Sequence, residues 1–186
     1  FRYRTQKILQ ILLVVYVGLT LVETVLLRMA GMSWFEAVCN SFSTIATGGF
    51  CTRNASIAAY GSLWIEMIVV FFMAVSGLHF GLIFATLTGK SNNIFRSEIS
   101  RYYVLSLLFG GLIVSVSLWA SDMYPTFASS MRYGFFQVVS VSSTTGFATA
   151  DSSVWTPLAI IVLILFTMQC ACAGSTTGGI KCDRVL

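Results

Sequence analysis

A polar turn occurs twice in this sequence, each time between long apolar stretches, and this repetition limits the folds that it can adopt. The segments 43–50 and 140–147 both place small and hydroxyl-bearing residues before a Thr-x-Gly-Phe sequence. A repeated turn in a repeated apolar pattern indicates a duplicated structural unit. Neither turn can lie against lipid, because its backbone N–H and C=O groups would have no partners there. Each turn must therefore be buried in protein or line a water-filled path, which points to a pore.

The composition indicates a membrane protein. Of the 186 residues, 56% are hydrophobic and 10% are charged, whereas a soluble domain has about 25% charged residues. We therefore expect an integral membrane protein. The sequence implies no covalent chemistry, so we do not expect an enzyme.

The five cysteines and the single histidine raise the question of a metal or redox site. Cys170 and Cys172 are the only close pair, and at two positions apart they would face different sides of a helix. The odd number of cysteines also argues against a disulfide framework. We favour buried thiols that pack as small apolar side chains. No metal site and no cofactor are expected.

Four apolar stretches have the length of roughly 20 residues that a bilayer core requires of a helix. They cover residues 8–29, 63–87, 102–120 and 155–173. The segments 33–46 and 130–143 are of mixed polarity and too short to span the membrane. The first opens with Ser33-x-x-Glu36, in which the two side chains cap each other's backbone N–H groups at a helix start. Each half is thus predicted to be a membrane helix, a short re-entrant helix, a polar turn and a second membrane helix.

Basic residues in the short connections predict the orientation, because such residues collect on the cytoplasmic side of membrane proteins. They precede the first span and occupy the link between the second and the third: Arg2, Arg4, Lys7, Lys90, Arg96 and Arg101. Both short helices would then enter the membrane from the opposite side.

The sequence starts without methionine and stops just after a new segment has begun. No secretory signal peptide is visible, since the first apolar stretch has the length of a full span. We interpret the chain as an excerpt of a longer polypeptide, with one repeat at 1–98 and a second, truncated repeat at 99–186.

The polar turns carry the residue types that can hold a dehydrated cation. A re-entrant helix places about half a negative charge at its C-terminus, which favours a cation there, and carbonyls of the following turn can replace water around the ion. Gly49 and Gly146 accept the positive φ angles of such a turn without a Cβ in the path. Thr47 and Thr144 add hydroxyl oxygens at the inner mouth, and the phenylalanine after each glycine would pack outward and brace the turn. The alternative is an ordinary glycine-containing helix end at the surface.

A second polar stretch interrupts the last apolar segment. It consists of Gly174, Ser175, Thr176, Thr177, Gly178 and Gly179. A Walker A phosphate loop ends in Gly-Lys-Ser/Thr, whereas here Ile180 precedes Lys181 and Cys182 follows it, so the phosphate interpretation fails. Irregular backbone at membrane depth is tolerated where it borders a cavity. We expect a flexible loop below the second polar turn.

Taken together, these motifs resemble those of the Trk/Ktr/HKT superfamily of potassium transporters, and most of all its bacterial TrkH members. The resemblance rests on TGGF at 47–50, TTGF at 144–147 and AGSTTGGIK at 173–181, and it covers essentially the whole chain. The superfamily has four helix–pore helix–helix repeats around one pore, and this chain resembles the second repeat and most of the third. Two departures are Cys51, where serine is expected, and Thr177, where glycine or alanine is usual.

The resemblance implies K⁺ uptake by a multi-pass, all-helical protein of the plasma (inner) membrane. Dehydrated K⁺ would be coordinated by carbonyls of a selectivity filter formed by Thr47, Gly48, Gly49, Thr144, Thr145 and Gly146. Movement of the loop from Gly174 to Gly179 would gate the flow. The resemblance also implies a homodimer and a cytoplasmic, nucleotide-binding regulatory subunit, and it gives no nucleic-acid partner.

Two other functions compete with K⁺ uptake. The first is a Na⁺-conducting or Na⁺/K⁺-cotransporting member of the same superfamily. Glycine at 49 and 146 favours K⁺, because members that pass Na⁺ often carry serine at a filter glycine. The second is a membrane-embedded redox subunit using Cys170, Cys172 and His79, which would need further histidines or a cofactor motif.

Four polar residues in or beside the apolar stretches have more than one interpretation. His79 could line the pore, although a packed and hydrogen-bonded helix histidine is favoured. Glu23 and Glu66 are costly in lipid, which makes both functional candidates. Glu66 is near the start of its helix and could equally be a favourable N-terminal charge. Lys181 could face the cavity below the loop or extend to the cytoplasmic interface.

Overall fold

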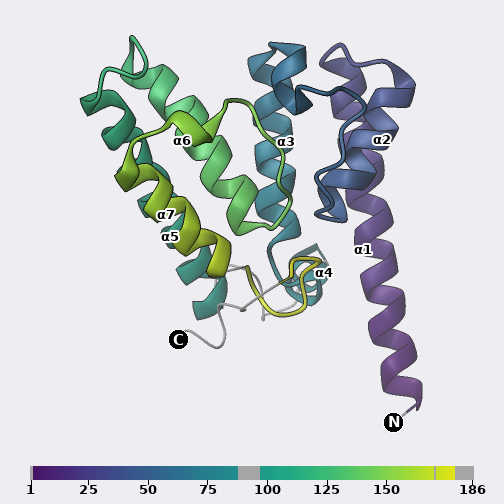
Figure 1. Ribbon diagram of the computed structural model, residues 1–186. Helices are drawn as coiled ribbons and strands as arrows, with labels where there is room; N and C mark the ends of the chain where they lie inside the picture. Colours follow the sequence, from purple (N-terminus) through teal and green to yellow (C-terminus); the bar gives the residue numbers. More distant parts are fainter. Residues whose placement is uncertain (1, 88–96, 170, 179–186) are drawn as a thin grey trace.

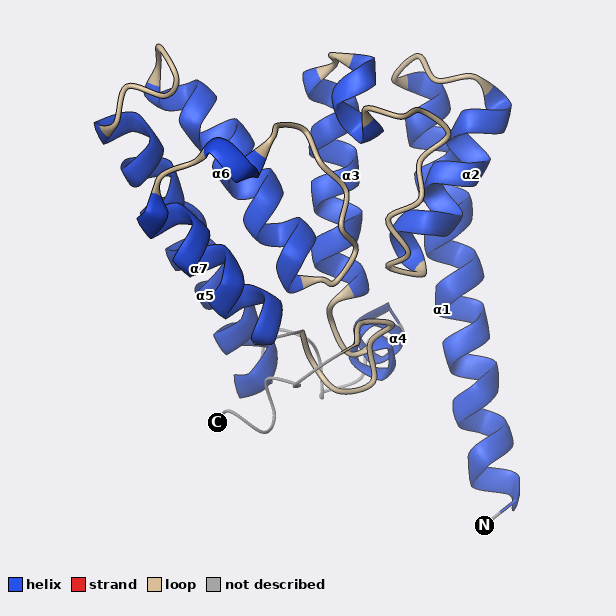
Figure 2. Cartoon of the chain, viewed as in Figure 1, coloured by secondary structure: helices blue, strands red, loops and turns tan. Residues whose placement is uncertain are grey.

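The computed structural model describes residues 2–87, 97–169 and 171–178. The secondary-structure elements within these ranges are helices (Figure 2), so the predicted all-helical fold is confirmed. In chain order they are α1 (Arg2–Met29), α2 (Trp34–Ile45), η1 (Ser56–Tyr60), α3 (Leu63–Ser76), α4 (Phe80–Leu87), α5 (Glu98–Ala120), α6 (Phe127–Ser142), η3 (Ser152–Val154) and α7 (Pro157–Met168).

The helices form two units of similar order that meet along α3 (Figure 1). In the first unit α1 is followed by the short α2, a turn and α3, and in the second α5 is followed by α6, a turn and α7. Helix α3 contacts α1, α2 and α6 and so joins the two units. The starts of α1 and α5 lie at one end of the molecule, and the starts of α2 and α6 lie at the other. This arrangement agrees with the expectation that both short helices enter from the same side, while the division of the chain at residue 98 stays a prediction.

Within the described residues, two helical segments are long and apolar enough to cross a bilayer, namely Leu9–Met29 of α1 and the whole of α5. Helices α3 and α4 meet this condition only as a pair, and they are bent by 103° relative to each other. The prediction of one continuous helix over 63–87 is therefore wrong at residues 77–79. The last predicted span, 155–173, is helical only over the 12 residues of α7. Both interruptions lie near one contact, in which the backbone around residues 77–80 pairs with the backbone at 172–174.

The starts of the short helices are fixed by side-chain caps. At α2 the backbone N–H of Glu36 donates to Ser33 Oγ at 3.3 Å and the N–H of Ser33 donates to the Glu36 carboxylate, which is the predicted capping box. At α6 the cap is Thr126, whose hydroxyl accepts from the N–H of Ser129 at 3.2 Å. This helix therefore begins three residues before the predicted boundary at 130.

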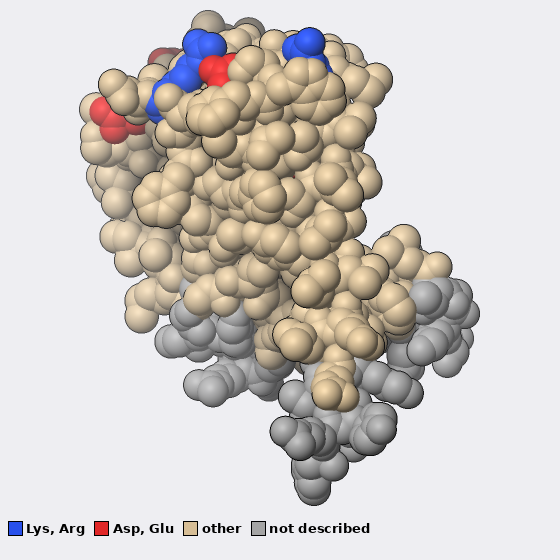
Figure 3. Space-filling model, turned by 90° about the vertical axis from the view of Figure 1, so that its right-hand side faces the viewer, with Lys and Arg blue, Asp and Glu red and all other residues tan. Residues whose placement is uncertain are grey.

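The largest side chains of the core come from both units. They include Leu27 of α1, Tyr103 of α5, Phe136 of α6 and Phe147 of the second polar turn, all almost fully buried. The outer faces of α1, α5 and α7 expose many large apolar side chains, as expected for helices in lipid or against other apolar helices. On the face shown in Figure 3 the charged side chains of the described residues gather at one end, and the other described residues on this face are uncharged or histidine.

Candidate functional site

The two polar turns have the same backbone conformation. Thr47 and Gly49 have φ angles of 52° and 70°, and Thr144 and Gly146 have φ angles of 54° and 85°, whereas the residue between each pair is not in this left-handed region. Glycine accepts such angles freely, as the sequence predicted. For threonine they are strained, and strained backbone of this kind costs about 1–3 kcal/mol and collects at functional sites. The repetition of the same strain in both turns supports a shared role.

The two turns lie directly against each other. A Cβ added to Gly49 would overlap the carbonyl oxygen of Thr145 and would come within 3.4 Å of the carbonyl carbon of Gly146. The segments that follow the turns are also joined, since the N–H of Ala58 donates to the carbonyl of Ala148 at 3.2 Å. The predicted filter residues of the two halves are therefore brought together by the fold.

The short helices hold the turns through their last carbonyls. In the first half the N–H of Thr47 donates to the carbonyl of Thr44 at 3.1 Å, and in the second the N–H of Thr144 donates to the carbonyl of Val141 at 3.0 Å. The carbonyls near each helix C-terminus are thus engaged by the turn, and the negative end of the helix dipole points at the same place.

The side-chain support of the two turns differs. The hydroxyl of Ser140 donates to the carbonyl of Phe147 at 2.6 Å, and the hydroxyls of Ser143 and Thr145 are 2.8 Å apart. Phe147 is fully buried, as expected for a side chain that braces its turn. Phe50 is 82% exposed, and its ring lies only against its own turn, 3.4 Å from where a Cβ on Gly48 would stand.

The loop at 171–178 contacts both turns and not only the second. Thr47 Oγ1 shares its proton between the carbonyl of Ala46 at 2.7 Å and the carbonyl of Thr176 at 3.2 Å, and the N–H of Gly178 donates to Thr144 Oγ1 at 3.1 Å. Within the loop, Ser175 Oγ donates to the carbonyl of Cys172 at 2.7 Å. The threonine hydroxyls that were assigned to the inner mouth therefore bind the predicted gating loop. Gly179, Lys181 and Cys170 lie outside the described residues.

The same loop is fastened to the bend between α3 and α4, which sequence reasoning missed. The N–H of Cys172 donates to the carbonyl of Gly77 at 3.0 Å, and the N–H of Phe80 donates to the carbonyl of Gly174 at 3.2 Å. Gly174 also abuts the imidazole of His79, because an added Cβ would lie 2.7 Å from Nε2. The sequence signal for this bend is the small and polar cluster Ser76, Gly77, His79 and Gly81 inside the apolar stretch.

His79 itself combines parts of both interpretations given above. Its Nδ1 accepts a hydrogen bond from the N–H of Gly81 at 3.0 Å, and its side chain is exposed in the described structure. It is hydrogen-bonded as favoured, but it lies beside the loop rather than inside a helix.

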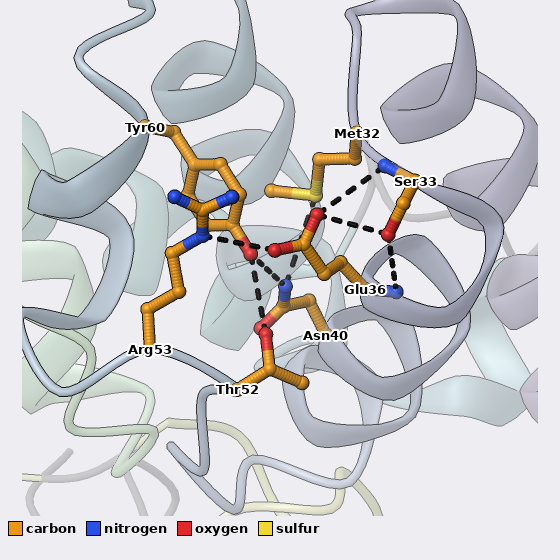
Figure 4. Close-up of polar contacts among 7 residues, drawn as sticks. All are labelled: Met32, Ser33, Glu36, Asn40, Thr52, Arg53 and Tyr60. Carbon is orange, nitrogen blue, oxygen red and sulfur yellow. Dashed lines mark hydrogen bonds and ion pairs between the residues drawn. The ribbon is translucent and has the colours of Figure 1, made fainter.

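A polar cluster fastens the segment after the first turn to the start of α2 (Figure 4). Arg53 Nε donates to the Glu36 carboxylate at 2.9 Å, and its guanidinium lies over the ring of Tyr60, 4.7 Å from the centroid. Asn40 Nδ2 donates to the hydroxyl of the same tyrosine at 3.2 Å. The Arg53 guanidinium and then the Ser33 hydroxyl hold the pKa of the Glu36 carboxyl below its ordinary value. Because Arg53 is half exposed, the pair contributes little stability and mainly fixes geometry.

A second ion pair joins the two units through α3 and α6. Arg132 binds the Glu66 carboxylate with both Nε and Nη2, at 2.6 and 2.7 Å, and the exposed fraction of the Glu66 side chain is 6%. Two parallel hydrogen bonds give such a pair a defined geometry. Glu66 is thus a tie between the two halves, in addition to its place in the first turn of α3.

We expect Arg132→Met to lower the free energy of unfolding of the full-length protein by about 1.5–3 kcal/mol, because it leaves a buried carboxylate without its donors. The measurement is thermal unfolding in detergent. The double variant Arg132→Met/Glu66→Met should be more stable than Arg132→Met alone, since it removes the stranded charge. The matched control is Arg53→Met, which breaks the exposed pair and should cost much less stability than Arg132→Met. Equal losses in the two single variants would contradict the assignment.

Among the described residues, no group of three or more His, Cys, Asp or Glu side chains could hold a metal ion. Cys39, Cys51 and Cys172 are not joined by disulfides among the described residues. The residues brought together at the site are instead backbone carbonyls, hydroxyls and glycines, which suit a dehydrated monovalent cation.

These features define a class of protein: an all-helical membrane protein in which two short helices end at equivalent polar turns that meet above an irregular loop. The sequence model of the family described as "TrkH: Cation transport protein" matches residues 3–116 and 121–186. The chain therefore belongs to the TrkH family of cation transport proteins.

Relatives and a solved structure agree with this assignment. The chain is 37% identical to the Trk system potassium uptake protein TrkH of Salmonella typhimurium over 187 residues, which is 100% of this chain and 38% of the relative. It is 37% identical to TrkH of Halomonas elongata over 173 residues, covering 92% of this chain and 36% of the relative. The crystal structure of the potassium transporter TrkH from Vibrio parahaemolyticus matches with a TM-score of 0.86 and 31% identity, over 91% of this chain and 37% of that one. The chain thus spans little more than a third of the length of these proteins.

Proposed function

We propose that the protein containing this chain takes up K⁺ across a membrane through a pore to which the two polar turns contribute. The observation that carries the proposal is that both turns have the same strained backbone and meet each other, while the loop below is hydrogen-bonded to a threonine of each. The choice of K⁺ as the ion comes from the relatives, which are named potassium uptake proteins and are about 37% identical to this chain.

The filter is proposed to use backbone carbonyls as ligands for dehydrated K⁺, as carbonyl rings do in selective pores. The residues are Thr47, Gly48, Gly49, Thr144, Thr145 and Gly146. The negative ends of α2 and α6 favour the cation at this place. The remaining ligands would come from the parts of the protein outside this chain, in which further repeats are expected.

The loop is proposed to act as the gate. Its residues are Gly174, Ser175, Thr176, Thr177 and Gly178, with Gly179 beyond the described part. Hydrogen bonds to both turns and to the α3–α4 bend hold it in place, so displacing the loop requires several weak bonds to break together. No bond of a substrate is made or broken, so the activity is transport and not enzymatic catalysis.

By resemblance, the full protein is proposed to be a homodimer in the plasma (inner) membrane, with a cytoplasmic, nucleotide-binding regulatory subunit. The repeats are proposed to be 1–98 and 99–186. A Na⁺-conducting member of the same family is the remaining alternative, because the rest of the filter lies outside this chain.

The proposal is tested by uptake of radioactive rubidium into vesicles that contain the full-length protein. We expect uptake above that of empty vesicles, displaced by K⁺ and little affected by an equal concentration of Na⁺, because the carbonyl filter prefers the larger ion. Equal displacement by Na⁺ would favour the Na⁺-conducting alternative. Absence of any rubidium uptake by correctly inserted protein would contradict the proposed function.

A further inference from the structure

The bend between α3 and α4 contains a glycine that its own backbone conformation does not require. Gly77 has φ −74° and ψ −13°, which are ordinary helical angles that any residue adopts. The glycine is required by space instead. A Cβ built on Gly77 would overlap the hydroxyl oxygen of Tyr103 and would lie 2.8 Å from the ring carbon that carries this oxygen. The same point is 3.0 Å from the Cβ of Ala171.

The three residues that meet here come from three segments. Gly77 follows the last residue of α3, Tyr103 lies in the second turn of α5, and Ala171 is the first residue of the loop at 171–178. The tip of the tyrosine ring thus fills the corner between the bend and the loop. The neighbouring Tyr102 adds a second contact, because its hydroxyl accepts a hydrogen bond from Gln169 Nε2 at 3.2 Å. The start of α5 therefore touches the bend and also the segment that leads into the loop.

Beside this corner the end of α3 holds the loop by hydrogen bonds. The N–H of Cys172 donates to the carbonyl of Gly77 at 3.0 Å, and the hydroxyl of Thr176 donates to the carbonyl of Ser76 at 3.4 Å. The last carbonyls of a helix have no partners within the helix, so they are available to another segment. The loop is thus attached to the place against which Tyr103 packs.

Tyr103 is therefore placed to fix the position of these acceptors. Tyr103 and Gly77 are both buried, and neither has room to move toward the other. In such close packing, a group that is added or removed on one side displaces its neighbour. A displaced Gly77 would carry its carbonyl away from the N–H of Cys172, and the attachment of the loop to the bend would be weakened.

We propose that Tyr103 is a positioning residue for the gate: its ring packs against Gly77 and holds the end of α3 where its carbonyls keep the loop against the two polar turns. Misfit at this contact, from either side, releases the loop and opens the path. The consequence for transport rests on the proposed function, whereas the attachment of the loop is tested without it.

The transport test uses Gly77→Ala and Tyr103→Leu in the full-length protein. The first variant forces a methyl group against the tyrosine, and the second leaves a void beside Gly77. Each should raise the initial rate of rubidium uptake by about fivefold or more, the effect of a modest packing defect on the equilibrium between a closed and an open loop. The ratio of K⁺ to Na⁺ uptake should not change. The double variant Gly77→Ala/Tyr103→Leu should return toward the parental rate, because leucine leaves room for the new methyl group and contacting residues are not additive.

The matched control is Gly111→Ala on the same helix as Tyr103. The three atoms nearest to a Cβ on Gly111 all belong to the ring of Phe135, at 2.8–2.9 Å, so this variant overpacks α5 against α6 instead of against the bend. It should cost stability and leave the rate of uptake unchanged. In protein that lacks residues 175–178, Tyr103→Leu should add nothing further, because the loop that the tyrosine positions is gone.

Reaction of Cys172 with a small maleimide tests the attachment of the loop without any transport. The thiol is 1% exposed, and its reaction requires access. The full-length protein is used with its other cysteines replaced by alanine. We expect slow labelling in the parent, in Gly111→Ala and in the double variant, and labelling about fivefold faster in Gly77→Ala and Tyr103→Leu, the same shift as in transport.

Parental uptake and parental labelling in both single variants would overturn the inference. So would a double variant whose changes equal the two single changes combined, since the residues would then act independently. If Gly77→Ala does not fold, Tyr103→Leu and the double variant still decide. If the parent takes up no rubidium, the proposed function fails, while the labelling of Cys172 still shows whether Tyr103 holds the loop.

Discussion

Replacing Gly49 with serine in the full-length protein is expected to reduce the preference for K⁺ over Na⁺ by about tenfold or more, as a strained or displaced backbone in the filter would. The new Cβ would overlap the carbonyl oxygen of Thr145, and the φ angle of 70° is unfavourable for any residue with a side chain. One of the two turns must therefore move. Because the carbonyls of both turns are proposed ligands, the ion site would be distorted in either case. The measurement is rubidium uptake into vesicles with Na⁺ as competitor.

Serine variants of two other glycines distinguish backbone strain from steric overlap as the cause of this effect. Gly61 has a φ angle of 55° and no atom within 4 Å of an added Cβ, so Gly61→Ser should cost stability through backbone strain but leave the ion preference unchanged. Gly146→Ser should weaken the preference less than Gly49→Ser, because its φ angle of 85° is strained but no described atom obstructs the side chain. An unchanged preference in both filter variants would remove these glycines from the filter.

Deleting residues 175–178 from the full-length protein is expected to raise K⁺ uptake several-fold and to leave the ratio of K⁺ to Na⁺ uptake nearly unchanged. The deletion removes the hydrogen bonds of the loop to Thr47 and Thr144. Each such bond contributes about 1 kcal/mol, so the population with an open path increases. The proposed filter lies in the turns above the loop, so the ion preference should not change with the deletion.

Initial rates of rubidium uptake, normalised to the amount of inserted protein, measure this effect. The control is Ser175→Ala, because the hydroxyl of Ser175 bonds only within the loop, to Cys172 and Thr177. Uptake at or below the parental rate in the deletion would defeat the assignment of the loop as a gate. A large change in the ion ratio would place the loop within the filter instead.

Local sequence patterns were sufficient for several elements. An apolar run of adequate length predicts α1 and α5, because a helix satisfies its backbone within the segment. Ser33 and Glu36 predict the start of α2, because a capping box involves residues three positions apart. The glycines at 49 and 146 predict a left-handed turn from their own stereochemistry. In each case the decisive interaction lies within a few residues of the signal.

The tertiary structure decided what depends on residues far apart in the chain. The apolar stretch that begins at Leu63 bends, and α7 stops at Met168, because the carbonyl of Gly77 and the N–H of Cys172 bind each other rather than their own helices. No local pattern reports such a pairing. The ion pair between Glu66 and Arg132 also joins residues far apart in the sequence.

The difference between the two polar turns was also hidden in the sequence. The repeated Thr-x-Gly-Phe motif suggests two equal turns, yet Phe147 is buried and Phe50 is exposed. Whether Glu23 faces lipid, water or protein likewise depends on how α1 packs against α2. The sequence by itself therefore determined α1, α5, the cap of α2 and the positions of the two turns, since these follow from short-range hydrogen bonding and hydrophobicity. Only the packing of distant segments decided where the apolar stretches break, what the loop binds and that Glu23 is buried.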